Sequence, residues 1–346
     1  MPVFPTLSDH SPGSAPPFAG QRVVFDATHG QSNWSQTGYA SREMHSNFAG
    51  LAQRLCRLGC TCLAMNERPL ARALAQARLL VIPPPTGRYL ARKECWAPAT
   101  SALFTAEEIQ ALLAFLRAGG RLLAFAYRFG DSFTCANLHS LFGPLGCLLH
   151  DDAVIDLTAL RTTPSLQIHF DTPADLLPIP WFRRGVDQLR WRAAATFTIV
   201  PGATAQPLAL SPGGRCIAFD RTQRRISFAS RPIAVAGTLA QGRFVLFGGP
   251  HLFETGTYGL LHEAANRQFL DHVLHWLLKN ELFPWGASDE APSPSSPWLV
   301  PGSMGNSDAF SLAEGHRSGK EMVDSVERVL RKTGLLKALS RARWMP

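Results

Sequence analysis

Three side chains suited to acid–base chemistry follow two apolar runs that lie far apart in the sequence. Asp26 and His29 come after the run at 22–25, and His251 comes soon after the run at 243–247. Open α/β sheets gather their site-forming loops at the carboxyl ends of their strands. If both runs are strands of one sheet, Asp26, His29 and His251 share one rim, and they are the candidate catalytic residues.

The residues around these three side chains extend the candidate site. The ligand-binding rim that we expect consists of Asp26, His29, Gly30, Gly249, His251 and Glu254. A local interpretation stays open, because Asp26 can accept hydrogen bonds from the backbone N–H groups of its own turn. His29 can then pack on Asp26, and His251 can hydrogen-bond at the end of its strand.

Neither a metal nor a cofactor is expected from the sequence. A zinc site needs three or four converging ligands, and Cys56, Cys60 and Cys62 lack the paired CxxC spacing of zinc knuckles. We interpret these cysteines as reduced and buried in the core, as free cysteines often are. No Gly-rich phosphate loop opens a helix, and His272 and His275 lie in an amphipathic helical pattern that predicts packing.

The spacing of apolar residues predicts the elements that must position these side chains. Strands are expected at 22–25, 60–65, 79–82, 121–126 and 243–247. Helices are expected at 41–58, from Thr105 to the Gly119-Gly120 pair, at 135–142 and at 263–279, and Thr105 with Glu108 predicts a capping box. Strands that alternate with helices favour a parallel sheet with helices on both faces.

Four segments follow from the changes in composition along the chain. Residues 1–19 are rich in Pro, Ser and Gly and are expected to be flexible, and 20–282 form the α/β domain. Within it, the short β-rich runs at about 148–241 predict an antiparallel or mixed insertion, either a separate lobe or an extension of the sheet. Residues 283–318 are a Pro/Ser/Gly-rich linker. Residues 319–346 predict a basic amphipathic helix.

The composition of the 346-residue chain is that of a folded protein rather than a disordered one. Hydrophobic residues make up 46% of the chain and charged residues 17%, below the roughly 25% of ordinary domains. No apolar run is long enough to predict a transmembrane helix. The first residues lack the basic and apolar regions of a signal peptide, so a cytoplasmic location is expected.

The positive charge gathers in the C-terminal segment. The formal net charge is +8, and residues 317–346 contain eight Lys and Arg residues but only three acidic residues. A basic amphipathic helix after a linker fits docking into a groove of a partner protein, and it also fits an anionic membrane surface. The residues that we expect to contact a partner are Met322, Val326, Arg328, Val329, Arg331 and Lys332.

Several motifs along residues 20–282 resemble those of one protein superfamily when they are taken in order. They are Phe25-Asp26 with His29-Gly30-Gln31, the capped helix from Thr105 to Gly119-Gly120, Asn137-Leu138 with Leu141-Phe142-Gly143, Phe247-Gly248-Gly249, and Asn266-Arg267-Gln268-Phe269 with Trp276-Leu277. Together they resemble the class I glutamine amidotransferase-like superfamily. Within it they are closer to the non-catalytic GIFT-type domains of gliding-motility and intraflagellar-transport proteins and to uncharacterised bacterial relatives. The resemblance implies a flavodoxin-like parallel sheet and, in those relatives, a scaffold or carbohydrate-binding role.

The same resemblance argues against amidotransferase activity. Enzymes of the superfamily carry a nucleophilic Cys at Gly-x-Cys-x-Gly on a sharp turn after a strand, whereas here the strand at 121–126 leads into Tyr127-Arg128-Phe129-Gly130. A displaced nucleophile at Cys135 is the alternative. His251 resembles the late catalytic His of these enzymes, which usually have a carboxylate two residues on. Here Leu252 and Phe253 intervene before Glu254.

The function expected from the sequence is a non-catalytic binding or scaffold protein that engages a protein partner through its C-terminal helix. One alternative is a hydrolase of unknown substrate that uses Asp26, His29 and His251. Another is an accessory protein of nucleic acids, since Trp181-Phe182-Arg183-Arg184 and Arg190-Trp191-Arg192 combine aromatic and basic residues. The other interpretation of these two segments is structural: a polar loop whose aromatic residues are anchored in the core.

Overall fold

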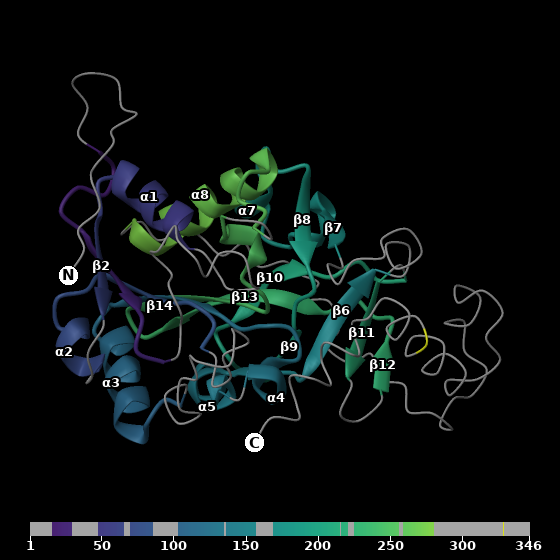
Figure 1. Cartoon of the computed structure of the whole chain (residues 1–346), viewed down its shortest axis with the longest axis horizontal. Helices are drawn as coiled ribbons and strands as arrows, with labels where there is room; N and C mark the ends of the chain where they lie inside the picture. Colours follow the sequence, from purple (N-terminus) through teal and green to yellow (C-terminus); the bar gives the residue numbers. More distant parts are fainter. Residues whose placement is uncertain are drawn as a thin grey trace, which may run out of the picture.

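The described part of the protein is a mixed α/β fold in which a large sheet lies between two layers of helices (Figure 1). The structure is a computed structural model. It describes residues 16–29, 48–65, 70–85, 103–134, 136–156, 169–214, 216–220, 225–255 and 259–279, together with Arg328. Within these ranges no helix is long and apolar enough to cross a membrane.

Parallel strands dominate the large sheet. The strands β1 (Arg22–Asp26), β2 (Thr61–Met65), β3 (Leu79–Ile82), β4 (Arg121–Phe125) and β14 (Gly242–Phe247) pair in parallel. Two more strands of the described chain, β10 (Gln206–Leu210) and β13 (Pro232–Leu239), join it antiparallel, and the order is β10-β13-β14-β4-β3-β1-β2. The two apolar runs that precede Asp26 and His251 therefore belong to one sheet, as predicted.

The β-rich insertion both extends the main sheet and builds smaller sheets beside it. Its strands β10 and β13 are the extension. The others form the pairs β5 (Cys147–Leu149) with β9 (Phe197–Ile199) and β7 (His169–Pro173) with β8 (Gln188–Arg192), and a three-stranded sheet of β6 (Asp152–Asp156), β11 (Cys216–Asp220) and β12 (Arg225–Ser227). In Figure 1 this last sheet lies at the opposite end of the molecule from α2.

Helices cover both faces of the main sheet, as predicted (Figure 1). The first face carries α1 (Ala49–Arg57), α7 (Pro180–Arg183) and α8 (Ala264–Leu278), and the second carries α2 (Leu70–Leu74), α3 (Ala106–Arg117), α4 (Gly130–Thr134) and α5 (Leu138–Phe142). The described residues also include the short 3-10 turns η3 (Gly143–Leu145), η4 (Ala174–Leu176) and η5 (His251–Phe253). The expected start of α1 at 41–47 lies outside the described residues.

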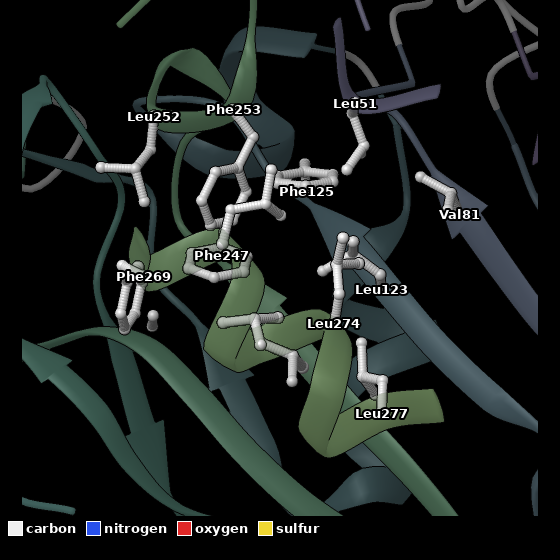
Figure 2. Close-up of a cluster of buried hydrophobic side chains, with 14 of the residues drawn as sticks. Leu51, Val81, Leu123, Phe125, Phe247, Leu252, Phe253, Phe269, Leu274 and Leu277 are labelled. Carbon is white, nitrogen blue, oxygen red and sulfur yellow. The ribbon is translucent and has the colours of Figure 1, made fainter. Parts of the chain in front are cut away.

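The sheet divides the hydrophobic core into two clusters because successive side chains of a strand point to opposite faces. Leu123, Phe125 and Phe247 face α1 and α8, and Figure 2 shows Phe253 and Phe269 beside them. Leu122, Ala124 and Leu246 face α3 and α5 in the second cluster. Each parallel strand is therefore buried on both sides, which explains its continuous apolar sequence.

Two helix boundaries show how the local sequence sets the elements. Thr105 caps α3, because its side chain accepts a hydrogen bond from the Glu108 N–H while the Glu108 side chain accepts one from the Thr105 N–H, as the capping box predicts. Gly59 ends α1 with φ of +94°, a conformation that favours glycine.

The aromatic and basic segments at 181–192 are not a loop, contrary to the loop interpretation. They form α7 and β8, and Phe182 and Trp191 are buried in the core. The alternation of Leu189, Arg190 and Trp191 is that of a strand with one buried face. Because its indole is enclosed, Trp191 does not offer a stacking surface for nucleic-acid bases.

Arginines line the amino-terminal edge of the main sheet. Arg22, Arg78, Arg121 and Arg243 stand at or next to the starts of four adjacent parallel strands. The Arg121 guanidinium donates to the carbonyls of Leu277, Gly119, Gly120 and Gln241, and Arg243 donates to those of Trp276 and Lys279. Burial, and then the charges of Arg78 and Arg243, lower the pKa of Arg121 to about 10. The row thus caps the carboxyl ends of α3 and α8, where cations are favourable.

Candidate functional site

His29 sits between two carboxylates at the carboxyl end of β1. Its Nδ1 lies 2.6 Å from Asp26 Oδ2 and its Nε2 lies 3.2 Å from Glu108 Oε2, at the start of α3. The ring stacks on Phe104 with a centroid distance of 3.8 Å. Asp26 and His29 are both 0% exposed. This buried network fastens the end of β1 to the start of α3.

The charge state of Asp26 reflects this network. Burial alone would raise the pKa of Asp26, but the hydrogen bond and charge of His29, together with hydrogen bonds from the N–H and hydroxyl of Thr28, lower it below its ordinary value. The local interpretation of Asp26 as a turn acceptor is therefore confirmed. Because the folded pKa is lowered, the stabilisation is present above pH ~4 and is lost as the pH falls through the folded value.

A second buried pair of histidine and carboxylate follows β14. His251 Nδ1 lies 2.6 Å from Glu254 Oε2, and the two residues are 6% and 2% exposed. The 3-10 turn η5 brings residues 251 and 254 to the same side of the chain. The intervening Leu252 and Phe253 therefore pack into the core and do not separate the pair. The Tyr127 ring meets the His251 ring edge-on at 5.5 Å.

Both histidines follow strands of the same sheet at its carboxyl edge, and each has a carboxylate partner of its own. In the strand order, β3 and β4 lie between β1 and β14, which places the two strand ends roughly 14 Å apart at the usual spacing of strands. His29 contacts Glu108 of α3, whereas Leu252 and Phe253 pack into the cluster that faces α1 and α8. The expected rim thus contains two histidine–carboxylate pairs along one sheet edge, and a site shared by Asp26, His29 and His251 stays a prediction.

The chain itself covers the end of β14. Residues 193–195 cross directly over Gly248 and Gly249, and the Ala195 N–H donates to the Gly248 carbonyl at 2.8 Å. A Cβ at Gly248 would overlap the Ala195 carbonyl, whereas a Cβ at Gly249 would make ordinary contacts with Ala193 and Ala194 at 3.4–3.5 Å. The approach of this segment, which we call the 193–195 strap, explains why residue 248 is a glycine.

A turn of bulky residues follows β4. It holds Tyr127, Arg128 and Phe129, and Phe129 has φ of +61°, a conformation that a non-glycine residue rarely adopts. The Phe129 N–H donates to the Asp152 carbonyl at 2.6 Å. A strained turn is thus present, and its strained residue is a buried phenylalanine.

Asp152 ties the strap to this turn. Its carboxylate accepts hydrogen bonds from the N–H of Thr196 at 2.7 Å and meets the Thr196 hydroxyl at 2.6 Å. Asp152 is 0% exposed. Burial raises the pKa of Asp152 to about 7, although the Thr196 hydrogen bonds and the charge of Arg231 oppose the rise and Asp220 adds to it.

We expect the replacement Asp152→Asn to remove a pH dependence of stability. Because the folded pKa of Asp152 is raised, the wild-type free energy of unfolding should fall between about pH 4 and about pH 7, by at most about 4 kcal/mol. An amide keeps both contacts with Thr196 and does not ionise. Urea unfolding across this range should therefore give a flatter profile for Asp152→Asn. The control Asp171→Asn, at a partly exposed carboxylate, should keep the wild-type slope. Equal slopes for Asp152→Asn and wild type would contradict this prediction.

The contacts of three residues in this region were not predicted from the sequence. Glu108 was noted only as a capping residue, yet it also faces His29. His169 and Arg192 stand opposite each other on β7 and β8, near His251. A glutamate in the first turn of a predicted helix could have drawn attention to Glu108. The pairing of β7 with β8 leaves no motif in the sequence.

Several expected site residues lie outside the described part of the chain. These are Gly30, Cys135, Met322, Val326, Val329, Arg331 and Lys332, whereas Arg328 is described and exposed. Among the described residues, Cys56, Cys60, Cys62, Cys147 and Cys216 are buried and outside any disulfide, as expected for the first three. No group of three His, Cys, Asp or Glu side chains within the described ranges is arranged to hold a metal ion. His272 packs as predicted and donates from Nδ1 to the Phe182 carbonyl.

No protein-family model matches the sequence, and no curated protein sequence matches it either. Among solved structures, the N-terminal domain of mmIFT52 aligns with a TM-score of 0.55 and 18% identity over 75% of this chain and 99% of its own. A ThuA-like protein from Bacteroides uniformis aligns with a TM-score of 0.43 and 12% identity over 78% and 94%. A cytoplasmic protein of Salmonella typhimurium LT2 gives 0.44 and 14% over 75% and 100%. The chain therefore shares the fold of the mmIFT52 N-terminal domain.

Proposed function

We propose that this protein is a non-catalytic binding or scaffold protein built on a class I glutamine amidotransferase-like domain. One observation carries the proposal: the carboxyl edge at β4 and β14, where sheets of this kind hold their ligands, is closed by the chain's own strap and by a turn of bulky residues. The strap covers Gly248 and Gly249, and Tyr127 and Phe129 are buried at the turn. A site closed in this way favours a structural or binding role over turnover.

The topology supports the superfamily part of the proposal. The parallel strands follow the order β2-β1-β3-β4-β14, which corresponds to the flavodoxin-like order 2-1-3-4-5. The likeness to the mmIFT52 N-terminal domain agrees with it at the level of the fold. We include a cytoplasmic location, because free thiols such as Cys56 and Cys62 persist in reducing compartments.

The proposed partner surface is the C-terminal segment 319–346, whose apolar stripe and basic face fit a helix that docks in a groove. The test compares quantitative pull-downs with the full chain and with a chain that lacks 284–346. A partner should be captured by the full chain and lost at least about tenfold from the shortened one. Thermal unfolding must show that the body folds equally in both.

A matched pair of substitutions sharpens this test. Val326→Asp places a charge on the apolar stripe, and Ser325→Asp adds the same charge one position away. Val326→Asp should lose the partner and Ser325→Asp should keep it. Equal capture by all of these proteins would overturn the proposed role of the segment. If the full chain instead binds vesicles of anionic lipid and captures no protein, the target of the segment is a membrane.

A second candidate function is hydrolysis, and the His251–Glu254 pair favours it. A carboxylate that holds one nitrogen of an imidazole leaves the other to act as a general base on water. Wild-type protein would then turn over some member of a panel of chromogenic esters and amides, and both His251→Ala and Glu254→Gln would abolish this. An inert wild type, or activity that survives His251→Ala, rejects this candidate.

A further inference from the structure

Three cysteines of the described chain lie where α1 packs on β2. Cys56 is in the last turn of α1, Cys60 directly precedes β2, and Cys62 lies within β2. Because side chains alternate along a strand, Cys60 and Cys62 point to the same face, and all three cysteines belong to the core cluster beneath α1 and α8. Each is at most 4% exposed and outside any disulfide. The end of α1 thus holds three thiols that the proposed function leaves unused.

Cys56 and Cys62 meet at one backbone carbonyl. The Cys62 thiol donates to the Ala52 carbonyl, with Sγ 3.6 Å from the oxygen. In an α-helix the same carbonyl accepts the N–H of the residue four positions later, which is Cys56. At the usual N–O distance, the Cys56 nitrogen therefore lies at most about 6.5 Å from Cys62 Sγ. Helical side chains tilt toward the N-terminus of their helix, so Cys56 leans toward the turn that Cys62 contacts.

The two thiols also interact with each other. Hydrogen bonds from the thiol and the N–H of Cys62 lower the pKa of Cys56 to about 7, although burial acts in the opposite direction. The single S–H of Cys62 serves either the Ala52 carbonyl or Cys56, and it turns to Cys56 when Cys56 ionises. Burial, and then the charge of Cys56, raise the pKa of Cys60 to about 12. Because the thiolate is the nucleophilic form, Cys56 is the most reactive of the three.

The pair lies at an end of a helix rather than in its middle. Cys56 is 4% exposed, and the neighbouring Arg57 and Gly59 are partly exposed. On the strand side, the exposed Thr61 directly precedes Cys62. Helix ends fray, so a molecule as small as a peroxide reaches Cys56 when the last turn of α1 opens.

We propose that Cys56 and Cys62 are a redox modification site, in which a peroxide oxidises the two thiols to a reversible disulfide. The Cys56 thiolate attacks one peroxide oxygen, the O–O bond breaks, and the departing oxygen takes up a proton. The Cys62 sulfur then attacks the Cys56 sulfenic acid, the S–S bond forms as the S–O bond breaks, and the hydroxyl leaves as water. Two electrons pass from the sulfurs to the peroxide. The disulfide fastens the last turn of α1 to β2, and it does not depend on the proposed binding function.

The experiment treats the full, folded chain with hydrogen peroxide and maps the disulfides by mass spectrometry after alkylation and trypsin digestion. Cleavage leaves Cys56 on the peptide 55–57 and both Cys60 and Cys62 on the peptide 58–72. The two peptides should become linked, and a dithiol reductant should separate them. Linkage should be at least about tenfold faster than oxidation of Cys147, whose pKa burial raises to about 12. Its rate should fall about tenfold from pH 8 to pH 6 as Cys56 takes up its proton.

Matched variants decide which thiols pair. Cys60→Ala should keep the linkage, because Cys62 remains on the second peptide. Cys62→Ala should lose it and leave a Cys56 sulfenic acid that dimedone traps. Circular dichroism must show that each variant is folded, and if Cys62→Ala is not, the result for Cys60→Ala decides. The inference is overturned if the wild type forms no linkage unless urea is present, or if folded Cys60→Ala loses the linkage.

Discussion

Replacing His29 with alanine should lower the free energy of unfolding by about 3–5 kcal/mol, the range measured when one partner of a buried charged group is removed. The imidazole lies 2.6 Å from Asp26 and 3.2 Å from Glu108, and none of its surface is exposed. Its removal leaves two buried carboxylates on either side of a cavity and takes away the ring that stacks on Phe104. Urea unfolding followed by circular dichroism measures the loss.

His139→Ala is the matched control for this substitution. His139 also meets a carboxylate, Asp131, at 2.7 Å, but its side chain is 65% exposed. An exposed pair contributes at most about 1 kcal/mol, so the control should stay close to wild type. If His29→Ala costs no more than His139→Ala, then the buried network does not hold β1 to α3, and His29 becomes available again as a functional residue.

The replacement Gly248→Ala should destabilise the protein by about 3 kcal/mol or more, because overpacking that meets backbone cannot be relieved by a side-chain rotation. The added methyl group would overlap the carbonyl oxygen and carbonyl carbon of Ala195 in the strap. The strap must then move away from β14, which breaks the hydrogen bond from the Ala195 N–H to the Gly248 carbonyl. Amide exchange should show lost protection at Ala195.

Gly143→Ala is the control that separates a steric effect from a general effect of adding a methyl group. A Cβ at Gly143 meets nothing within 4 Å, and the residue has φ of −52°, which alanine adopts readily. This variant should be neutral or gain up to about 1 kcal/mol. A Gly248→Ala protein with wild-type stability and protection would show that the strap does not cover the end of β14.

The sequence by itself predicted the five parallel strands of the main sheet and most of its helices. Continuous apolar runs such as Leu79–Ile82 report strands buried on both faces. Thr105 and Glu108 define a helix start through their own backbone contacts, and Gly59 defines a helix end through its positive φ. These signals are local, because each depends on residues within one or two turns of the chain.

Only the tertiary structure decided how the polar residues group. The spacing of His251 and Glu254 looked too long for a pair until η5 brought them together. His29 contacts Asp26 at the end of its own strand and Glu108 from a helix about eighty residues away.

The physical reason is the range of the interactions. Strand order, which places β3 and β4 between β1 and β14, depends on nonlocal pairing and packing, and short sequence patterns do not record it. The same holds for the glycine at 248, which is required by a strap more than fifty residues earlier in the chain. Sequence therefore specified the elements and their polar ends, and the fold decided which of those ends meet.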